Sequence, residues 1–169
     1  MSQKLLIIDP FDIFIFVTEE PYYRRKIFDT LGQNYTRTLL QNNSDKIYLA
    51  TDAGRVMEKL KQMRTEKGYR IVMVSPYAQD SVREILQHYK FPYQNLYRFS
   101  AAQDRRDITF RDITGYFEVK PADCLFMSAY RNELEEARQY GMKVLFFDRS
   151  NLLHSSEDIH RLEEIEFHL

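Results

Sequence analysis

The sequence has almost no cysteine, which removes several classes of structure at once. Cys124 is the only one among 169 residues, so an internal disulfide and a cysteine-cluster metal site are excluded. It lies in an apolar run, where we expect a buried free thiol. Glycine and proline are scarce, with five of each, and tryptophan is absent. The chain therefore has the composition of an ordinary globular protein rather than of a low-complexity one.

An excess of charge of one sign is also missing. The 24 Lys and Arg residues nearly cancel the 25 Asp and Glu residues, so binding to nucleic acid or to an anionic membrane would need a local patch. No apolar run approaches the length of a membrane span, and the first residues do not resemble a secretory signal. We expect a protein of the cytoplasm or nucleus, with no membrane partner.

Short apolar runs alternate with helical patterns along the chain, which is typical of βαβ units and a parallel sheet. The predicted strands are residues 5–8, 71–74, 96–99, 125–127 and 144–147. Apolar residues at helical spacing predict four helices. The first begins near Asp52 as its N-cap, and the others include residues 82–89, 110–117 and 134–137. A last helix is predicted behind a cap at residues 155–158. We predict one doubly wound, mostly parallel α/β domain over residues 1–169.

A flap and loop insertion is predicted at residues 13–45. The apolar run 13–17 is followed by two glutamates and a proline, which favours a hairpin or flap over a helix. Within it, five consecutive residues combine aromatic rings with positive charge: Tyr22, Tyr23, Arg24, Arg25 and Lys26. Such a patch can bind nucleic acid or an acidic partner, and a solvated flap is the alternative.

The candidate site residues follow the predicted strands. Ligands of an open parallel sheet bind at the carboxyl ends of its strands. Asp9 follows strand 5–8, Ser75 follows strand 71–74, Arg106 lies in the charged stretch after residue 99, and residues 128–129 follow strand 125–127. Each also has a purely structural interpretation, because Asp9 can cap a turn, Ser75 can start a loop and Arg106 can belong to a solvated face.

This order of residues resembles the haloacid dehalogenase superfamily, and within it the small magnesium-dependent phosphatases with a minimal cap. The resemblance extends from Lys4 to about Phe147, and its most specific stretch is 123–144, which is similar to the family's fourth motif and the helix after it. It implies a Rossmann-like α/β fold with a small flap or hairpin in place of a large cap.

The family's first motif, Asp-x-Asp-x-Thr after an apolar strand, is matched only at its first position. Asp9 matches the nucleophile, which attacks phosphorus to form an aspartyl-phosphate. Phe11 occupies the position of the general acid/base, and Ile13 that of the threonine. Asp12 is one residue out of phase, so its side chain is expected to point elsewhere.

The other motifs are matched unevenly. Ser75 matches the hydroxyl that hydrogen-bonds a phosphoryl oxygen, and Arg106 takes the place of the lysine that neutralises nucleophile and phosphate. Ser128 and Ala129 stand where the family has paired acids that hold magnesium. Magnesium usually takes one or two carboxylates besides water and phosphate, and Asp9 alone remains for it. We therefore expect no bound metal or other cofactor, and an Asp9–Arg106 ion pair.

These losses predict a catalytically inactive pseudophosphatase that acts as a binding or regulatory module for a protein partner. The flap and the last, acidic helix are the surfaces expected to bind it, since an exposed aromatic segment suits an interface. The alternative is a slow or atypical phosphatase with Asp9 as nucleophile, in which Arg106 replaces both lysine and metal. Magnesium would be a cofactor only under this alternative.

Overall fold

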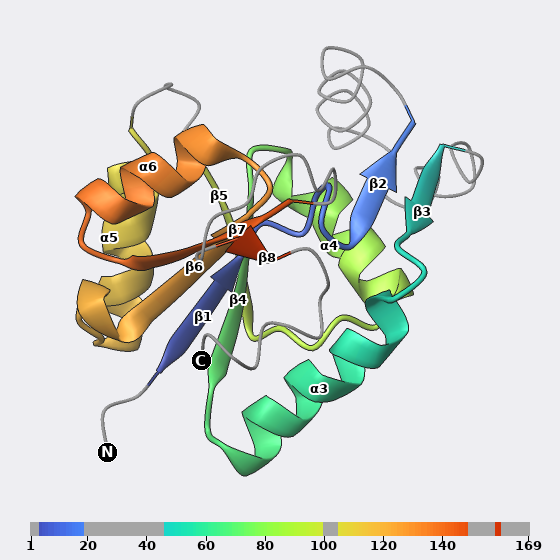
Figure 1. Ribbon diagram of the computed structural model, residues 1–169, viewed down its shortest axis with the longest axis horizontal. Helices are drawn as coiled ribbons and strands as arrows, with labels where there is room; N and C mark the ends of the chain where they lie inside the picture. The colour runs from blue at the N-terminus through green and yellow to red at the C-terminus, as the bar shows by residue number, and fades with distance from the viewer. Residues whose placement is uncertain (1–3, 19–45, 100–104, 149–157, 160–169) are drawn as a thin grey trace.

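The computed structural model describes residues 4–18, 46–99, 105–148 and 158–159, and a six-stranded sheet runs through its centre (Figure 1). The strand order is β5 (Asn95–Arg98), β4 (Arg70–Ser75), β1 (Leu5–Ile8), β6 (Cys124–Ser128), β7 (Lys143–Phe147) and β8 (Asp158–Ile159). All neighbouring strands are parallel. The predicted α/β fold with a mostly parallel sheet is confirmed, and Cys124 is a buried free thiol, as predicted.

The sheet is covered on both faces, which explains why its central strand is apolar throughout. Along β1, Leu6 and Ile8 face one core, and Leu5 and Ile7 face the other. Figure 1 shows helices on opposite sides of the sheet: α3 (Ala53–Glu66) with α4 (Gln79–His88), and α5 (Arg106–Phe117) with α6 (Arg131–Gln139). None of the described helices is both long and apolar enough to cross a membrane.

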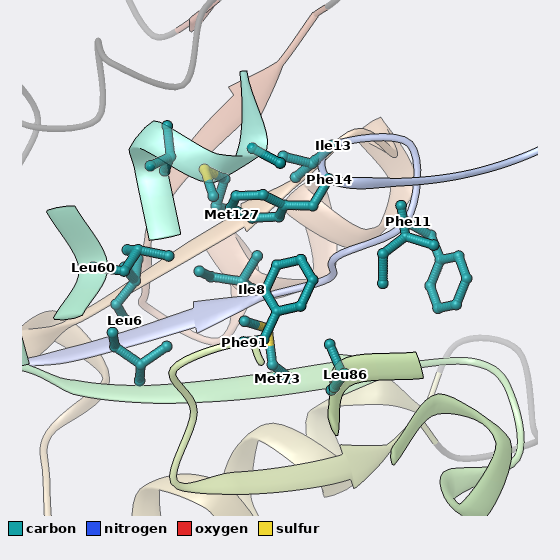
Figure 2. Close-up of a cluster of buried hydrophobic side chains, with 14 of the residues drawn as sticks. Leu6, Ile8, Phe11, Ile13, Phe14, Leu60, Met73, Leu86, Phe91 and Met127 are labelled. Carbon is teal, nitrogen blue, oxygen red and sulfur yellow. The ribbon is translucent and has the colours of Figure 1, made fainter. Parts of the chain in front are cut away.

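The loop after β1 contributes large side chains to the first of these cores. Figure 2 shows Phe11, Ile13 and Phe14 beside side chains of the central strands and of α3 and α4. The ring of Phe14 meets that of Phe91 edge-on at 5.3 Å between centroids. The segment after the carboxyl end of β1 is therefore anchored by packing in the core and is not a solvent-exposed loop.

A two-stranded antiparallel sheet follows this loop. In it β2 (Ile15–Val17) pairs with β3 (Ile47–Leu49). Just beyond the pair, the N–H of Thr18 donates to the carbonyl of Lys46 at 3.0 Å. The apolar run 13–17 does contain a strand, but its partner is β3, which the sequence did not predict. Residues 19–45, with most of the predicted flap and the basic aromatic patch 22–26, lie outside the described residues.

One local prediction is confirmed and another was wrong. Asp52 is the N-cap residue of α3, as predicted, although its side chain makes no capping hydrogen bond; the N–H of Ala53 donates to the carbonyl of Ala50 at 3.1 Å. Asp158 and Ile159 do not begin a helix, because they pair with β7 as β8. The free edge of β7 offers backbone partners that a local capping pattern cannot reveal. The remainder of the predicted last helix lies outside the described residues.

Candidate functional site

Asp9 is placed at the carboxyl edge of the sheet by the central position of β1. Its N–H donates to the carbonyl of Met127 in the neighbouring strand β6 at 3.0 Å. Its Oδ1 accepts the N–H of Phe11 at 3.0 Å, which is a local side-chain-to-backbone turn. The residue is fully buried, and its Oδ2 meets no hydrogen-bond donor among the described residues.

Phe11 lies in the core and not in an open site. It is fully buried, and its ring meets that of Tyr77 edge-on at 4.7 Å between centroids. The position that the family resemblance assigns to a general acid/base therefore holds an apolar side chain that packs as one. Tyr77 also connects this ring to Ser75, because its N–H donates to the Ser75 hydroxyl oxygen at 3.2 Å. Ser75, the last residue of β4, is itself buried.

Asp12 does not point away from the site, and the prediction that it would was wrong. It adopts a left-handed conformation with φ 56°, which turns the chain so that its N–H donates to the carbonyl of Ile15 at 2.8 Å. Its carboxylate accepts a hydrogen bond from the hydroxyl of Tyr130, in the connection between β6 and α6. The prediction assumed that the chain continues in an extended conformation after Asp9, with alternate side chains on opposite faces. The chain turns at Asp12, so this alternation does not apply.

Glu133 is the site residue that sequence reasoning missed. Ser128, at the end of β6, donates its hydroxyl to Glu133 Oε2 at 2.8 Å, and its oxygen accepts the N–H of Tyr130 at 3.0 Å. Glu133 is buried in the first turn of α6, where the helix dipole favours a negative charge. A signal for it was available, because Glu133 precedes Ala137 by four residues and so shares the buried face of this helix.

Arg106 faces α6, in a position where its charge meets two glutamates. It is the first residue of α5, and its side chain is only 15% exposed. Its Nη1 forms an ion pair with Glu136, and its Nε lies 3.9 Å from Glu133 Oε1, too far for a hydrogen bond. Its guanidinium lies over the ring of Phe99 at 5.3 Å. The expected Asp9–Arg106 ion pair is not formed among the described residues, and the interpretation of Arg106 as a solvated residue was wrong.

The buried carboxyl groups of Asp9 and Glu133 each affect the pKa of the other. Burial raises the pKa of Asp9 well above its ordinary value, and the charge of Glu133 raises it further. Burial also raises the pKa of Glu133, but the hydroxyl of Ser128 and the charge of Arg106 oppose this. Asp9 therefore favours its neutral form more strongly than Glu133 does, and its Oδ2 has no hydrogen-bond partner among the described residues.

The same environment keeps Tyr130 neutral. Burial is the main reason why the pKa of its hydroxyl is raised, and the charge of Asp12 and the hydrogen bond to it add to the effect. The hydroxyl thus remains a donor to Asp12. Hydrogen bonds connect Asp12 with Tyr130, Tyr130 with Ser128, and Ser128 with Glu133.

The residues present do not fit the magnesium ion that the family resemblance implies. Magnesium requires octahedral oxygen ligation, yet one oxygen of Glu133 is occupied by the Ser128 hydroxyl and the other faces Arg106. In the described parts of the chain, no group of three or more His, Cys, Asp or Glu side chains could hold a metal ion. The guanidinium of Arg106 would also repel a divalent cation placed among these acids.

Comparison with known proteins identifies the fold through solved structures. No protein-family model matches the sequence, and no curated protein is significantly similar to it. A predicted phosphoglycolate phosphatase from Haemophilus somnus is similar with a TM-score of 0.68 at 13% identity, covering 99% of this chain and 98% of that one. A HAD-superfamily hydrolase from Ehrlichia chaffeensis has a TM-score of 0.65 at 13% identity, with 99% and 97% covered.

A third similar structure is a HAD-superfamily hydrolase of subfamily IA from Geobacter sulfurreducens, with a TM-score of 0.66 at 10% identity; the alignment covers 99% of this chain and 100% of that one. All three share the parallel α/β architecture across nearly their whole length. The chain therefore has the fold of the haloacid dehalogenase superfamily hydrolases, as the resemblance of its sequence implied.

Proposed function

We propose that this chain, with its haloacid dehalogenase fold, is a catalytically inactive pseudophosphatase that acts as a binding or regulatory module. One observation carries the proposal: the residue at the nucleophile position, Asp9, is fully buried, and burial and the charge of Glu133 raise its pKa well above the ordinary value. A carboxyl group attacks phosphorus as an accessible anion, so both the burial of Asp9 and the direction of its pKa shift oppose this role.

Two further features of the site support inactivity. Phe11 fills the general acid/base position and is packed into the core, and a positioned general acid/base contributes about 10²–10⁴-fold to rate. The positive charge of Arg106 is already directed at Glu133 and Glu136, so an incoming phosphate would have to displace two carboxylates to reach it. The proposed module requires no cofactor.

The antiparallel pair of strands β2 and β3 supports the proposal of a protein partner. Phe16 and Tyr48 stack on its outer side with ring centroids 5.5 Å apart, and Tyr48 is half exposed. Exposed aromatic rings are enriched where proteins bind one another. The basic aromatic patch Tyr22–Lys26 of the same flap remains a second, weaker proposal, for nucleic acid; its mark would be a steep dependence of binding on salt. A free cysteine accords with the proposed cytoplasmic or nuclear location.

Phosphate release tests the main proposal. The protein would be incubated for hours with aryl and sugar phosphates in the presence of magnesium, beside an Asp9→Asn variant as the matched control. We expect wild type and control to be indistinguishable. Turnover above about 0.1 s⁻¹, two decades below a median enzyme, that the control abolishes would refute inactivity.

A slow phosphatase is the alternative, and one observation favours it. Glu133 and Asp12 bring two further carboxyl groups close enough to Asp9 to raise its pKa, so a group that could accept a proton as a general base lies beside the nucleophile position. Under this alternative, any residual turnover should be lost in both the Asp9→Asn and the Glu133→Gln variants. Turnover that survives in Glu133→Gln would remove the support that the structure gives to this second function.

A further inference from the structure

Arg106 is the described cation that faces the acidic cluster at the carboxyl edge of the sheet. The cluster consists of Asp9, Asp12, Glu133 and Glu136, supplied by the β1 loop and by α6. Arg106 reaches it from α5 with an ion pair to Glu136 and a 3.9 Å approach to Glu133. The backbone N–H of Arg106 also donates to Glu136 Oε2 at 3.3 Å. Both the side chain and the backbone N–H of Arg106 thus bind to a side chain of α6.

The surroundings hold the guanidinium in place rather than leaving it to solvent. Its side chain is mostly buried and lies over the ring of Phe99 at 5.3 Å, a cation–π geometry that suits arginine. Glu133 and Glu136 are three residues apart on one helix, so they project from the same face toward it. The neighbouring Arg105 differs in each respect, because it is mostly exposed and pairs with Asp107 at 3.4 Å.

Charge balance shows what this placement achieves. Glu133 and Glu136 bring two carboxylates beside Arg106, and its guanidinium offsets part of their charge through the ion pair with Glu136 and the 3.9 Å approach to Glu133. A buried group of acids without such compensation would be unstable unless a cation entered it. In the haloacid dehalogenase fold a divalent ion would be the expected cation, but the residues here do not fit one.

We propose that the guanidinium of Arg106 is a built-in counter-ion, which replaces a divalent cation in balancing the acids Glu133 and Glu136 beside Asp9. The chain then keeps its acidic cluster folded without magnesium. This inference goes beyond the proposed function, because a slow enzyme and an inactive module would need the same charge balance. Its test measures stability and not turnover, so the two proposals can fail separately.

The experiment compares thermal unfolding in EDTA with unfolding at rising Mg²⁺ concentration. Wild type and the exposed-neighbour control Arg105→Gln should show the same melting temperature throughout. Arg106→Gln should melt lower in EDTA and should gain about 5–11 °C when free Mg²⁺ reaches about 100 times its dissociation constant. Arg106→Lys keeps the positive charge, so it should melt lower than wild type but remain insensitive to Mg²⁺.

A second variant covers the case in which Arg106→Gln folds poorly. Arg106→Gln combined with Glu136→Gln removes both ends of one ion pair, so a smaller excess of negative charge is left beside Asp9, and it too should be stabilised by Mg²⁺. Recovery of folding by Mg²⁺ in either variant supports the proposal. Three outcomes would overturn the proposal. The variants could remain unfolded at saturating Mg²⁺, or they could fold without any response to Mg²⁺. Alternatively, Mg²⁺ could stabilise the wild type as strongly as it stabilises Arg106→Gln.

Discussion

Replacement of Asp9 by asparagine should stabilise the protein, and increasingly so as the pH rises. Burial and the charge of Glu133 raise the pKa of the wild-type carboxyl, so folding favours its neutral form, and its Oδ1 accepts the N–H of Phe11. Asparagine is uncharged at every pH, and its carbonyl oxygen can accept the same N–H. It differs from the wild-type residue in having no proton to lose, so the variant avoids the cost of holding an acid in its protonated form.

The sign and size of the effect follow from proton linkage. Because the pKa of Asp9 is raised on folding, the folded state binds more protons than the unfolded state. Wild-type stability therefore falls as the pH rises from the unfolded value, about 3.9, to the raised folded value, and is constant beyond it. The slope for one proton is about 1.4 kcal/mol per pH unit, so the advantage of the variant should grow by about 2.7 kcal/mol over two pH units inside this window.

Urea unfolding of both proteins between about pH 5 and about pH 8 measures the difference. Titrating groups that do not interact with Asp9 change both curves equally and cancel when one free energy of unfolding is subtracted from the other. Asp80→Asn is the matched control, since Asp80 is exposed and pairs with Arg83 at 2.6 Å within α4; its difference from wild type should vary little over this range. If the Asp9→Asn difference is equally flat, folding does not raise the pKa of Asp9 and our account of its environment is wrong.

Three other perturbations test separate parts of the structure. Phe11→Ala should lower the free energy of unfolding by about 3–5 kcal/mol, because it leaves a cavity beside Tyr77; a loss below 1 kcal/mol in urea would mean that the ring is not packed. Tyr130→Phe should cost about 1.5–3 kcal/mol by the same assay, since it removes a hydrogen bond to the charged Asp12. Burial raises the pKa of the Cys124 thiol to about 12, so an aromatic disulfide reagent should modify it slowly in native buffer and rapidly in urea. Rapid modification in native buffer would show that β6 is open to solvent.

The central sheet could be predicted from sequence because its signals are local. Strands β1, β4 and β6 are buried on both faces and are therefore continuous apolar runs, which stand out between polar helices. The short strands β3 and β8 have no such signal, since each is defined by the strand with which it pairs. A strand of two or three residues depends on tertiary pairing more than on its own side chains.

The candidate site was predictable only where it follows the strand ends. Asp9, Ser75 and Ser128 could be found by position, because parallel strands end at one edge. Glu133 lies five residues beyond its strand and one turn into a helix, so the contact that gives it a role comes from helix geometry. The partner of Arg106 lies 30 residues away in sequence, at Glu136. No local pattern distinguishes that pairing from one with Asp9.

The hydrogen bond between Thr18 and Lys46 has a consequence for how this protein can change over evolutionary time. The chain leaves the described body and returns to it through adjacent residues, so residues 19–45 are attached at one narrow base. The entropic cost of joining two such chain ends grows only logarithmically with the length of the segment between them, by about 0.6 kcal/mol for each doubling. An insertion or deletion between Thr18 and Lys46 would therefore cost the parallel sheet little stability, and evolution could add a new recognition element at this point.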